Sequence, residues 1–197
     1  MASVEATLRA KAVATYRVAK PASRAALVAR TGGQIVLVWG FALGVLPALA
    51  MKVDERLALP RLRWRRRVPA GVALFAAGSA VGLASAWYMA SEGKGTPIPF
   101  DAASRLVVAG PYRLVRNPMA VSAIAQSAGI ALALGSPTAS LIPISGAVMW
   151  NRVIRPSEED FLVGLFGDPY RRYQDAVRCW VPTWPPYRPG PSPIGGH

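Results

Sequence analysis

Residues 119–150 read MAVSAIAQSAGIALALGSPTASLIPISGAVMW and contain no charged side chain. Two apolar runs, 119–135 and 137–150, are separated only by Gly135-Ser136-Pro137. Small residues recur in both runs, and small residues let helix backbones approach closely in lipid. The stretch therefore predicts a tight helical hairpin whose tip lies near a membrane interface. A hairpin buried in a soluble bundle would have a similar pattern.

Two upstream segments favour the membrane over the soluble bundle. Residues 33–51 and 68–89 also lack charge, and a spanning helix needs about 20 apolar residues. Neither segment has the polar face of a surface helix. In the whole chain 52% of residues are hydrophobic and only 17% are charged, against about a quarter charged in soluble domains. We expect an all-α integral membrane protein with about four transmembrane helices, including the hairpin.

The remaining segments suggest three parts. Residues 1–31 hold six basic residues around Ala and Val with Glu5 as the only acid, which indicates an amphipathic N-terminal helix on the membrane surface. A targeting peptide is the alternative interpretation. Residues 32–181 form the expected membrane-embedded domain, with short interfacial helices after residue 150. Residues 182–197 are a Pro/Gly-rich tail that should be irregular.

The net charge of +13 can indicate nucleic acid or anionic lipid as a partner. The basic residues flank apolar segments, and seven of them lie between Lys52 and Arg67. We therefore expect the lipid bilayer as the partner and no nucleic acid. Four spans place the loop at 52–67 opposite the loop at 90–118, so the positive-inside rule gives no clean orientation.

The sequence contains very few residues that could supply an imidazole or a thiol. The only histidine is His197 and the only cysteine is Cys179. A histidine-based zinc site, a Ser-His-Asp triad and a disulfide within the chain are therefore not expected. We predict no metal site.

The first candidate motif is GPYRLVRNPM, from Gly110 to Met119, immediately before the hairpin. Pro118 suits the first turn of a helix, where no backbone N–H is required. Arg113 and Arg116 would then lie at the membrane boundary beside free N–H groups of the helix start, which favours anion binding. An interfacial arginine anchor is the alternative interpretation.

The second candidate motif is RPSEEDFLVGLFGDPYRRY, at 155–173. Pro156 disfavours a helix at Arg155, so we expect the last span to break or kink there. Glu158, Glu159 and Asp160 would suit the first turn of a helix electrostatically. Three acids near two arginines, Arg152 and Arg155, are nevertheless costly at membrane level and suggest a functional site.

The order of these blocks, G-P-Y-R-x-x-R-x-P-M, apolar hairpin, then E-E-x-x-L-x-x-x-F-G-x-x-Y-x-x-Y, resembles the isoprenylcysteine carboxyl methyltransferase and phospholipid methyltransferase superfamily. The resemblance covers about residues 90–182 and includes Gly93-Lys94-Gly95, similar to a glycine-containing cofactor loop. Members often have histidine before the proline and tyrosine after the methionine, where this chain has Asn117 and Ala120. Asparagine cannot carry a proton near neutral pH, but it can still bind a cofactor.

The resemblance implies S-adenosyl-L-methionine as cofactor and methyl transfer to a lipid-soluble or membrane-resident acceptor, from an active site facing the cytoplasm. It implies arginine partners for the cofactor carboxylate, acids for its hydroxyl or amino groups, aromatic rings over adenine and close backbone approach at the glycines. The implied cofactor-binding residues are Gly93, Gly95, Tyr112, Arg113, Arg116, Asn117, Pro118, Met119, Arg152, Glu158, Glu159, Tyr170 and Tyr173. The implied catalytic residues are Arg155, Glu158 and Glu159, with either acid as the base for an amine acceptor.

Two other functions remain open from the sequence. One is a membrane NADPH-dependent reductase, because the C-terminal regions of sterol reductases look broadly similar. The other is a non-enzymatic membrane scaffold, because the departures at Asn117 and Ala120 are what such a relative would have. The acceptor also stays open among lipid amines, prenyl-type carboxylates and thiols, as does the oligomeric state.

Overall fold

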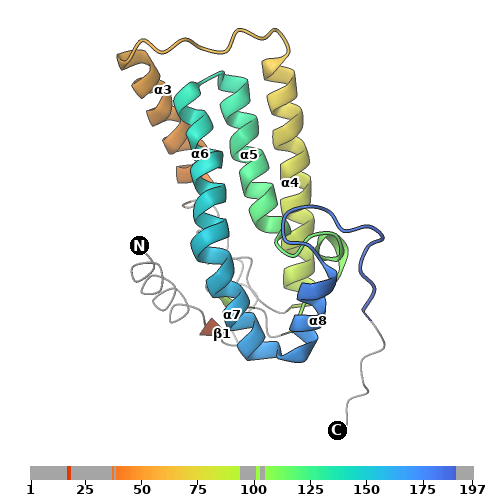
Figure 1. Cartoon of the computed structure of the whole chain (residues 1–197). Helices are drawn as coiled ribbons and strands as arrows, with labels where there is room; N and C mark the ends of the chain where they lie inside the picture. The colour runs from red at the N-terminus through yellow and green to blue at the C-terminus, as the bar shows by residue number, and fades with distance from the viewer. Residues whose placement is uncertain (1–16, 19–36, 38, 94–100, 103–104, 190–197) are drawn as a thin grey trace.

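A computed structural model describes residues 17–18, 37, 39–93, 101–102 and 105–189. Its helices are α3 (Leu46–Arg56), α4 (Arg67–Ser91), α5 (Pro118–Leu134), α6 (Pro137–Met149), α7 (Arg155–Phe166) and α8 (Asp168–Ala176). The described residues also include two π-helical segments, η1 (Phe41–Val45) and η3 (Trp150–Ile154), and one 3₁₀ turn, η2 (Gly110–Arg113). Helices α3 to α6 run side by side, and α7 and α8 lie at one end of them (Figure 1).

The expected N-terminal helix is tested at only two positions. Arg17–Val18 forms the short strand β1, which pairs in parallel with β2, Asp101–Ala102. The backbone at these two residues is therefore extended, not helical. The rest of the N-terminal prediction lies outside the described residues, as does Gly95.

Helices α4 and α5 pack through small residues. A Cβ atom at Gly71 would lie 2.4 Å from the carbonyl oxygen of Gly129, and one at Gly129 would lie 2.6 Å from that of Gly71. Farther along, the hydroxyl of Ser122 donates to the carbonyl oxygen of Gly78 at 2.7 Å. The two backbones are thus close enough that no side chain fits between them, which is how small residues associate helices in lipid.

The predicted hairpin is confirmed. Gly135 ends α5 with φ of 63°, the left-handed conformation that glycine adopts without strain. Ser136 then begins α6, and its hydroxyl oxygen accepts from the N–H of Ala139 at 3.0 Å. The carboxylate of Asp54, from α3, accepts from the Ser136 hydroxyl and from the N–H of Thr138, so it binds the hairpin tip to α3.

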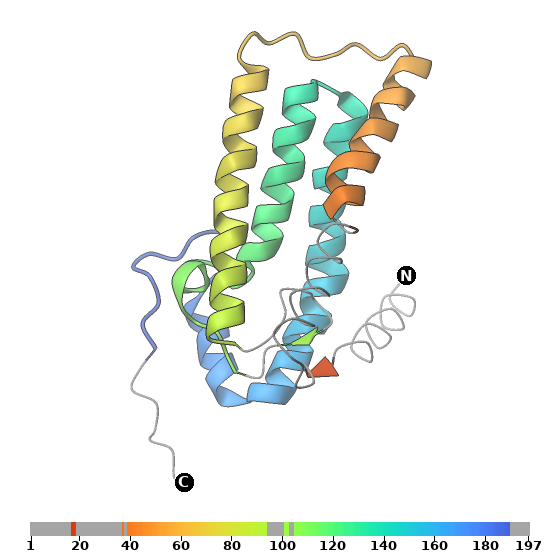
Figure 2. The same cartoon turned by 180° about the vertical axis from the view of Figure 1, so that it is seen from behind.

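We expected the last span to break or kink at Arg155, and the chain does not break there. The chain continues helically from α6 through η3 into α7, and the N–H of Arg155 donates to the carbonyl oxygen of Trp150 within the wider π turn. A proline ring would clash with the carbonyl four residues earlier in an α-helix. The wider turn accommodates that ring without ending the helix. Figure 2 shows the ribbon running from α6 into α7 without a gap. Ser157 accordingly lies inside the helix and donates to the carbonyl oxygen of Val153.

Four spans are not confirmed. Within the described residues α4 alone is long and apolar enough to cross a membrane, and only 17% of its most apolar window is buried by the protein. The core helix of a soluble protein would be mostly buried, so the exposed apolar surface of α4 supports membrane embedding. Helix α5 is apolar but has 17 residues, and α6 has 13.

The contact between Gly71 and Gly129 generates a stability prediction. We expect Gly71→Ala to lower the free energy of unfolding by about 1–3 kcal/mol, because its methyl group must push two backbones apart. Gly146→Ala is the matched control, since a Cβ there meets nothing within 4 Å, and alanine favours a helix over glycine. Thermal unfolding in detergent measures both, and equal melting temperatures for the two variants would contradict the packing described.

Candidate active site

A cavity of about 1040 Å³ extends from the apolar middle of the helices to the end where α7 and α8 lie. Its walls come from η1, α4, α5, α6, α7 and α8. Apolar side chains dominate the part between the helices, and the charged side chains gather where α5 begins. A pocket of this form suits a ligand with one polar end and one apolar end.

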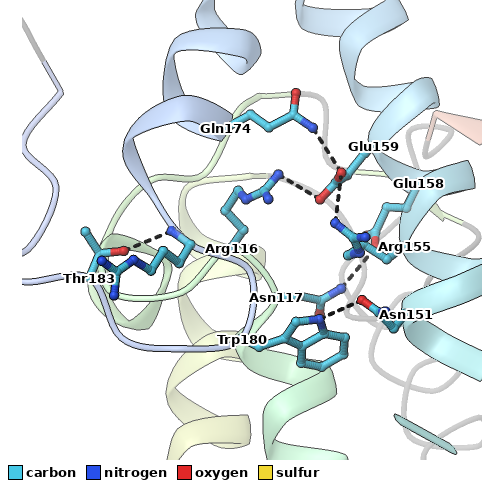
Figure 3. A network of polar contacts seen from close by, with 10 residues as sticks. Arg116, Asn117, Asn151, Arg155, Glu158, Glu159, Gln174, Trp180 and Thr183 are labelled. Atoms are coloured by element: carbon cyan, nitrogen blue, oxygen red, sulfur yellow. Dashed lines mark hydrogen bonds and ion pairs between the residues drawn. The ribbon is translucent and has the colours of Figure 1, made fainter. Parts of the chain in front are cut away.

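Glu159 holds the polar end together (Figure 3). Its carboxylate accepts from Nη1 of Arg116 at 2.7 Å and from Nε2 of Gln174 at 2.9 Å. Nη1 of Arg155 lies 3.6 Å from the same carboxylate. The loop before α5, helix α7 and helix α8 therefore converge on one acid.

Asn117 has two roles. Its Oδ1 accepts from the N–H of Ala120 at 3.1 Å and so caps α5, while its Nδ2 donates to Glu158 at 3.1 Å. This pair of bonds fixes the orientation of the amide, because only the Oδ1 side can accept from a backbone N–H. The residue that stands where relatives often have histidine thus connects the hairpin to the first acid of α7.

The segment after α8 packs along the first motif. The N–H of Arg116 donates to the carbonyl oxygen of Arg178 at 3.0 Å, and the N–H of Thr183 donates to that of Leu114 at 2.8 Å. Nε of Arg113 donates to the carbonyl oxygen of Tyr187 at 2.7 Å. The described part of the expected tail is therefore irregular in backbone but fixed against residues 113–116.

Burial, and in second place the charge of Glu159, raises the pKa of the Glu158 carboxyl from its ordinary value of 4.5 to about 7. The hydrogen bond from Asn117 opposes this shift. Glu158 therefore changes its charge near neutral pH, which is the property a proton acceptor needs. Burial also raises the pKa of Tyr112 and Tyr170, so both phenols remain hydrogen-bond donors.

Four buried polar atoms in the described residues have no hydrogen-bond partner, and all four belong to residues that line the cavity. They are Oη of Tyr112, Nε of Arg116, Nε1 of Trp150 and Nε of Arg155. A buried donor without a partner costs about 1–3 kcal/mol. Each of the four can donate, so the site suits a ligand that carries several acceptor atoms.

The structure brings most of the predicted site residues to this cavity. Those that line it are Tyr112, Arg116, Asn117, Met119, Arg155, Glu158, Glu159, Tyr170 and Tyr173. Pro118 is buried in the first turn of α5, and Gly93 lies just beyond α4. Arg113 points to Tyr187 instead, and Arg152 is exposed on η3. These four do not line the cavity.

Two residues of the site were not predicted from the sequence. Gln174 lies four positions after Tyr170, so helical periodicity on α8 places both on one face. Trp150 lies in η3, one turn before Arg155, and its indole N–H has no partner. Gln174 could have been predicted from its helical spacing to the tyrosines. Trp150 could not, because its position depends on the π turn.

The structure is a helical bundle whose α5–α6 hairpin carries a charged cavity end at its base, where the two sequence motifs meet. The sequence model of the phospholipid methyltransferase family matches residues 66–169, more than half of the 197 residues. The chain therefore belongs to the phospholipid methyltransferase family, within the superfamily of integral membrane methyltransferases that the motifs indicated. The match covers α4, the first motif and the second motif up to Pro169. Searches of curated proteins and of solved structures returned no match.

The raised pKa of Glu158 generates a prediction about stability and pH. The folded state holds the Glu158 proton more tightly than the unfolded state, so wild type loses stability as pH rises from 4.5 to about 7. We expect the melting temperature of Glu158→Gln minus that of wild type to be larger at pH 8 than at pH 5, since glutamine cannot ionise. Asp160→Asn, which changes an exposed acid on the same helix, is the control and should show no such rise. A difference that is the same at both pH values would contradict the burial of a titrating Glu158.

Proposed function

We propose that this protein transfers a methyl group from S-adenosyl-L-methionine to a membrane-resident acceptor. The observation that carries the proposal is the meeting of Arg116 and Asn117 with Glu159 and Glu158 at the polar end of an apolar cavity. Membership of the phospholipid methyltransferase family supports methyl transfer over the reductase and scaffold alternatives. No observation specifically favours either alternative.

The residues present fit the proposed cofactor. Its carboxylate needs cationic donors, and Arg116 and Arg155 each have a buried Nε–H without a partner. Arginine binds carboxylates strongly through such N–H groups. The unpartnered hydroxyl of Tyr112 and indole N–H of Trp150 can donate to further acceptor atoms. Tyr170, with its aromatic ring at the cavity wall, can cover adenine.

When bound, S-adenosyl-L-methionine supplies a methyl group on a sulfonium that is already activated. The protein then contributes by positioning the two reactants and by excluding water, and neither task requires a metal. The apolar walls between the helices keep water from the polar end and admit an acceptor from the bilayer. We infer that the polar end faces the cytoplasm, where the proposed cofactor is available.

Glu158 is the group we assign to proton transfer. An amine acceptor must lose a proton before it can be methylated, and a base works best when its pKa lies near the working pH. The Glu158 pKa of about 7 meets that condition. Glu159 is bound to two arginines and Gln174, so its role is to hold the arginines in place.

Binding of the demethylated cofactor product tests the arginine assignment. We expect Arg155→Ala to weaken S-adenosylhomocysteine about tenfold to a hundredfold, as loss of a charged hydrogen bond does. Arg152→Ala, in the same helix but exposed, should bind within twofold of wild type. Isothermal titration in detergent measures both, with NADPH as a second ligand. Binding of NADPH alone, or wild-type affinity in Arg155→Ala, would reject the site.

A radiolabelled methyl donor with native lipid extract tests the reaction and identifies the product. We expect label in a lipid-soluble product, and we expect Glu158→Gln to lower the rate about a hundredfold or more, as loss of a general base does. The wild-type rate should rise with pH through about 7, because only the ionised carboxylate of Glu158 accepts a proton. Unchanged S-adenosylhomocysteine affinity in Glu158→Gln separates this role from cofactor binding. A Glu158→Gln variant that keeps the wild-type rate would remove the base assignment.

A further inference from the structure

The cavity has a second polar group, halfway along α5. Gln126 lines the cavity nine positions after Asn117, which corresponds to about 13 Å along an α-helix. Apolar side chains that line the same cavity include Leu43, Leu83 and Ile142. A polar side chain that faces a cavity at membrane depth is costly and suggests a role in binding.

The serine residues around Gln126 have no hydroxyl hydrogen left for a ligand. Ser79 donates to the carbonyl oxygen of Phe75 at 2.9 Å. Ser127 donates to that of Ala123 at 2.8 Å. Ser122 donates to that of Gly78 at 2.7 Å. Each hydroxyl satisfies a backbone carbonyl, so the cavity-lining serines here serve the helices.

The bond between Gln126 and Ser122 fixes which way the amide points. The Ser122 hydroxyl has one hydrogen, and the Gly78 carbonyl receives it. Ser122 can then only accept from Gln126, which agrees with Nε2 of Gln126 donating to Oγ of Ser122 at 3.2 Å. Oε1 of Gln126 is therefore directed away from Ser122, and no donor from the described residues bonds to it.

We propose that Gln126 is a specificity-determining residue that accepts a hydrogen bond from an O–H or N–H group of the lipid acceptor. A donor that reaches this cavity-lining oxygen forms a hydrogen bond worth about 0.5–1.5 kcal/mol net. A lipid whose linkage region bears a free hydroxyl or amide N–H restores that bond, whereas a lipid joined only through esters cannot donate. The inference rests on the proposed function, since it concerns the acceptor of the same cavity.

A matched pair of lipids tests the proposal. One is a single-chain phosphoethanolamine lipid with a free hydroxyl on the central glycerol carbon, and the other has hydrogen in its place. The purified protein in detergent is given both in equal amounts, and the retained lipids are quantified by mass spectrometry. We expect wild type to enrich the hydroxylated lipid about fivefold to tenfold, as one net hydrogen bond allows.

Gln126→Met keeps a side chain of similar length without either hydrogen-bonding group, so the enrichment should fall to about one. Ser127→Ala is the control, because the Ser127 hydroxyl is used within its own helix, and it should enrich like wild type. Equal retention of both lipids by wild type, retention of neither, or wild-type enrichment in Gln126→Met would overturn the proposal. The affinity for S-adenosylhomocysteine, measured on the same preparations, should be unchanged in Gln126→Met. If wild type did not bind S-adenosylhomocysteine at all, the proposed function itself would fail, whatever the lipid result.

Discussion

The ion pair between Arg116 and Glu159 is the contact on which the polar end of the molecule depends. The two side chains are only 12% and 14% exposed, so both charges have lost most of their water. Removing one partner from such a pair costs about 3–5 kcal/mol, because the other charge stays buried without compensation. Gln174 and Arg155 add two further contacts to the same carboxylate. One acid therefore fixes the loop before α5 relative to α7 and α8, and the cavity has a polar end because these segments cannot separate.

Asn117 couples this polar end to the α5–α6 hairpin. The cap that it provides to α5 is typically worth about 1 kcal/mol. The same side chain donates to Glu158 and opposes the upward shift of its pKa. A histidine at this position would share a proton with its surroundings near neutral pH, whereas the amide only donates and accepts. In the proposed mechanism proton transfer is therefore assigned to Glu158, and Asn117 positions it.

The hairpin could be predicted from the sequence because it depends on local signals, whereas the meeting of the two motifs was expected only from the family resemblance. Gly135-Ser136-Pro137 encodes a left-handed C-cap, an N-cap and a helix start in three residues. The roles of the arginines could not be predicted in the same way. Arg113 and Arg116 occupy equivalent places in the motif, but the 3₁₀ turn η2 directs Arg113 to Tyr187, which is 74 positions away. The number of spans could not be predicted either, because it depends on the lengths of the helices. An apolar run without charges does not reveal where its helix ends and a charge-free loop begins.

The π turn that replaces the expected break at Arg155 has the largest consequence for the site. Each residue turns an α-helix by roughly 100°, and a π turn accommodates an additional residue within an otherwise α-helical ladder. The face presented by α7 is therefore rotated by about that angle from the face that the periodicity of α6 would predict. On the face so presented, Glu158 accepts from Asn117 and Glu159 accepts from Arg116. A second π segment, η1, precedes Pro47 in the same way, because Val45 and Ile154 each lie two positions before a proline. Both prolines therefore follow a widened helical turn. Before Pro156, that turn determines which side chains of α7 face the site.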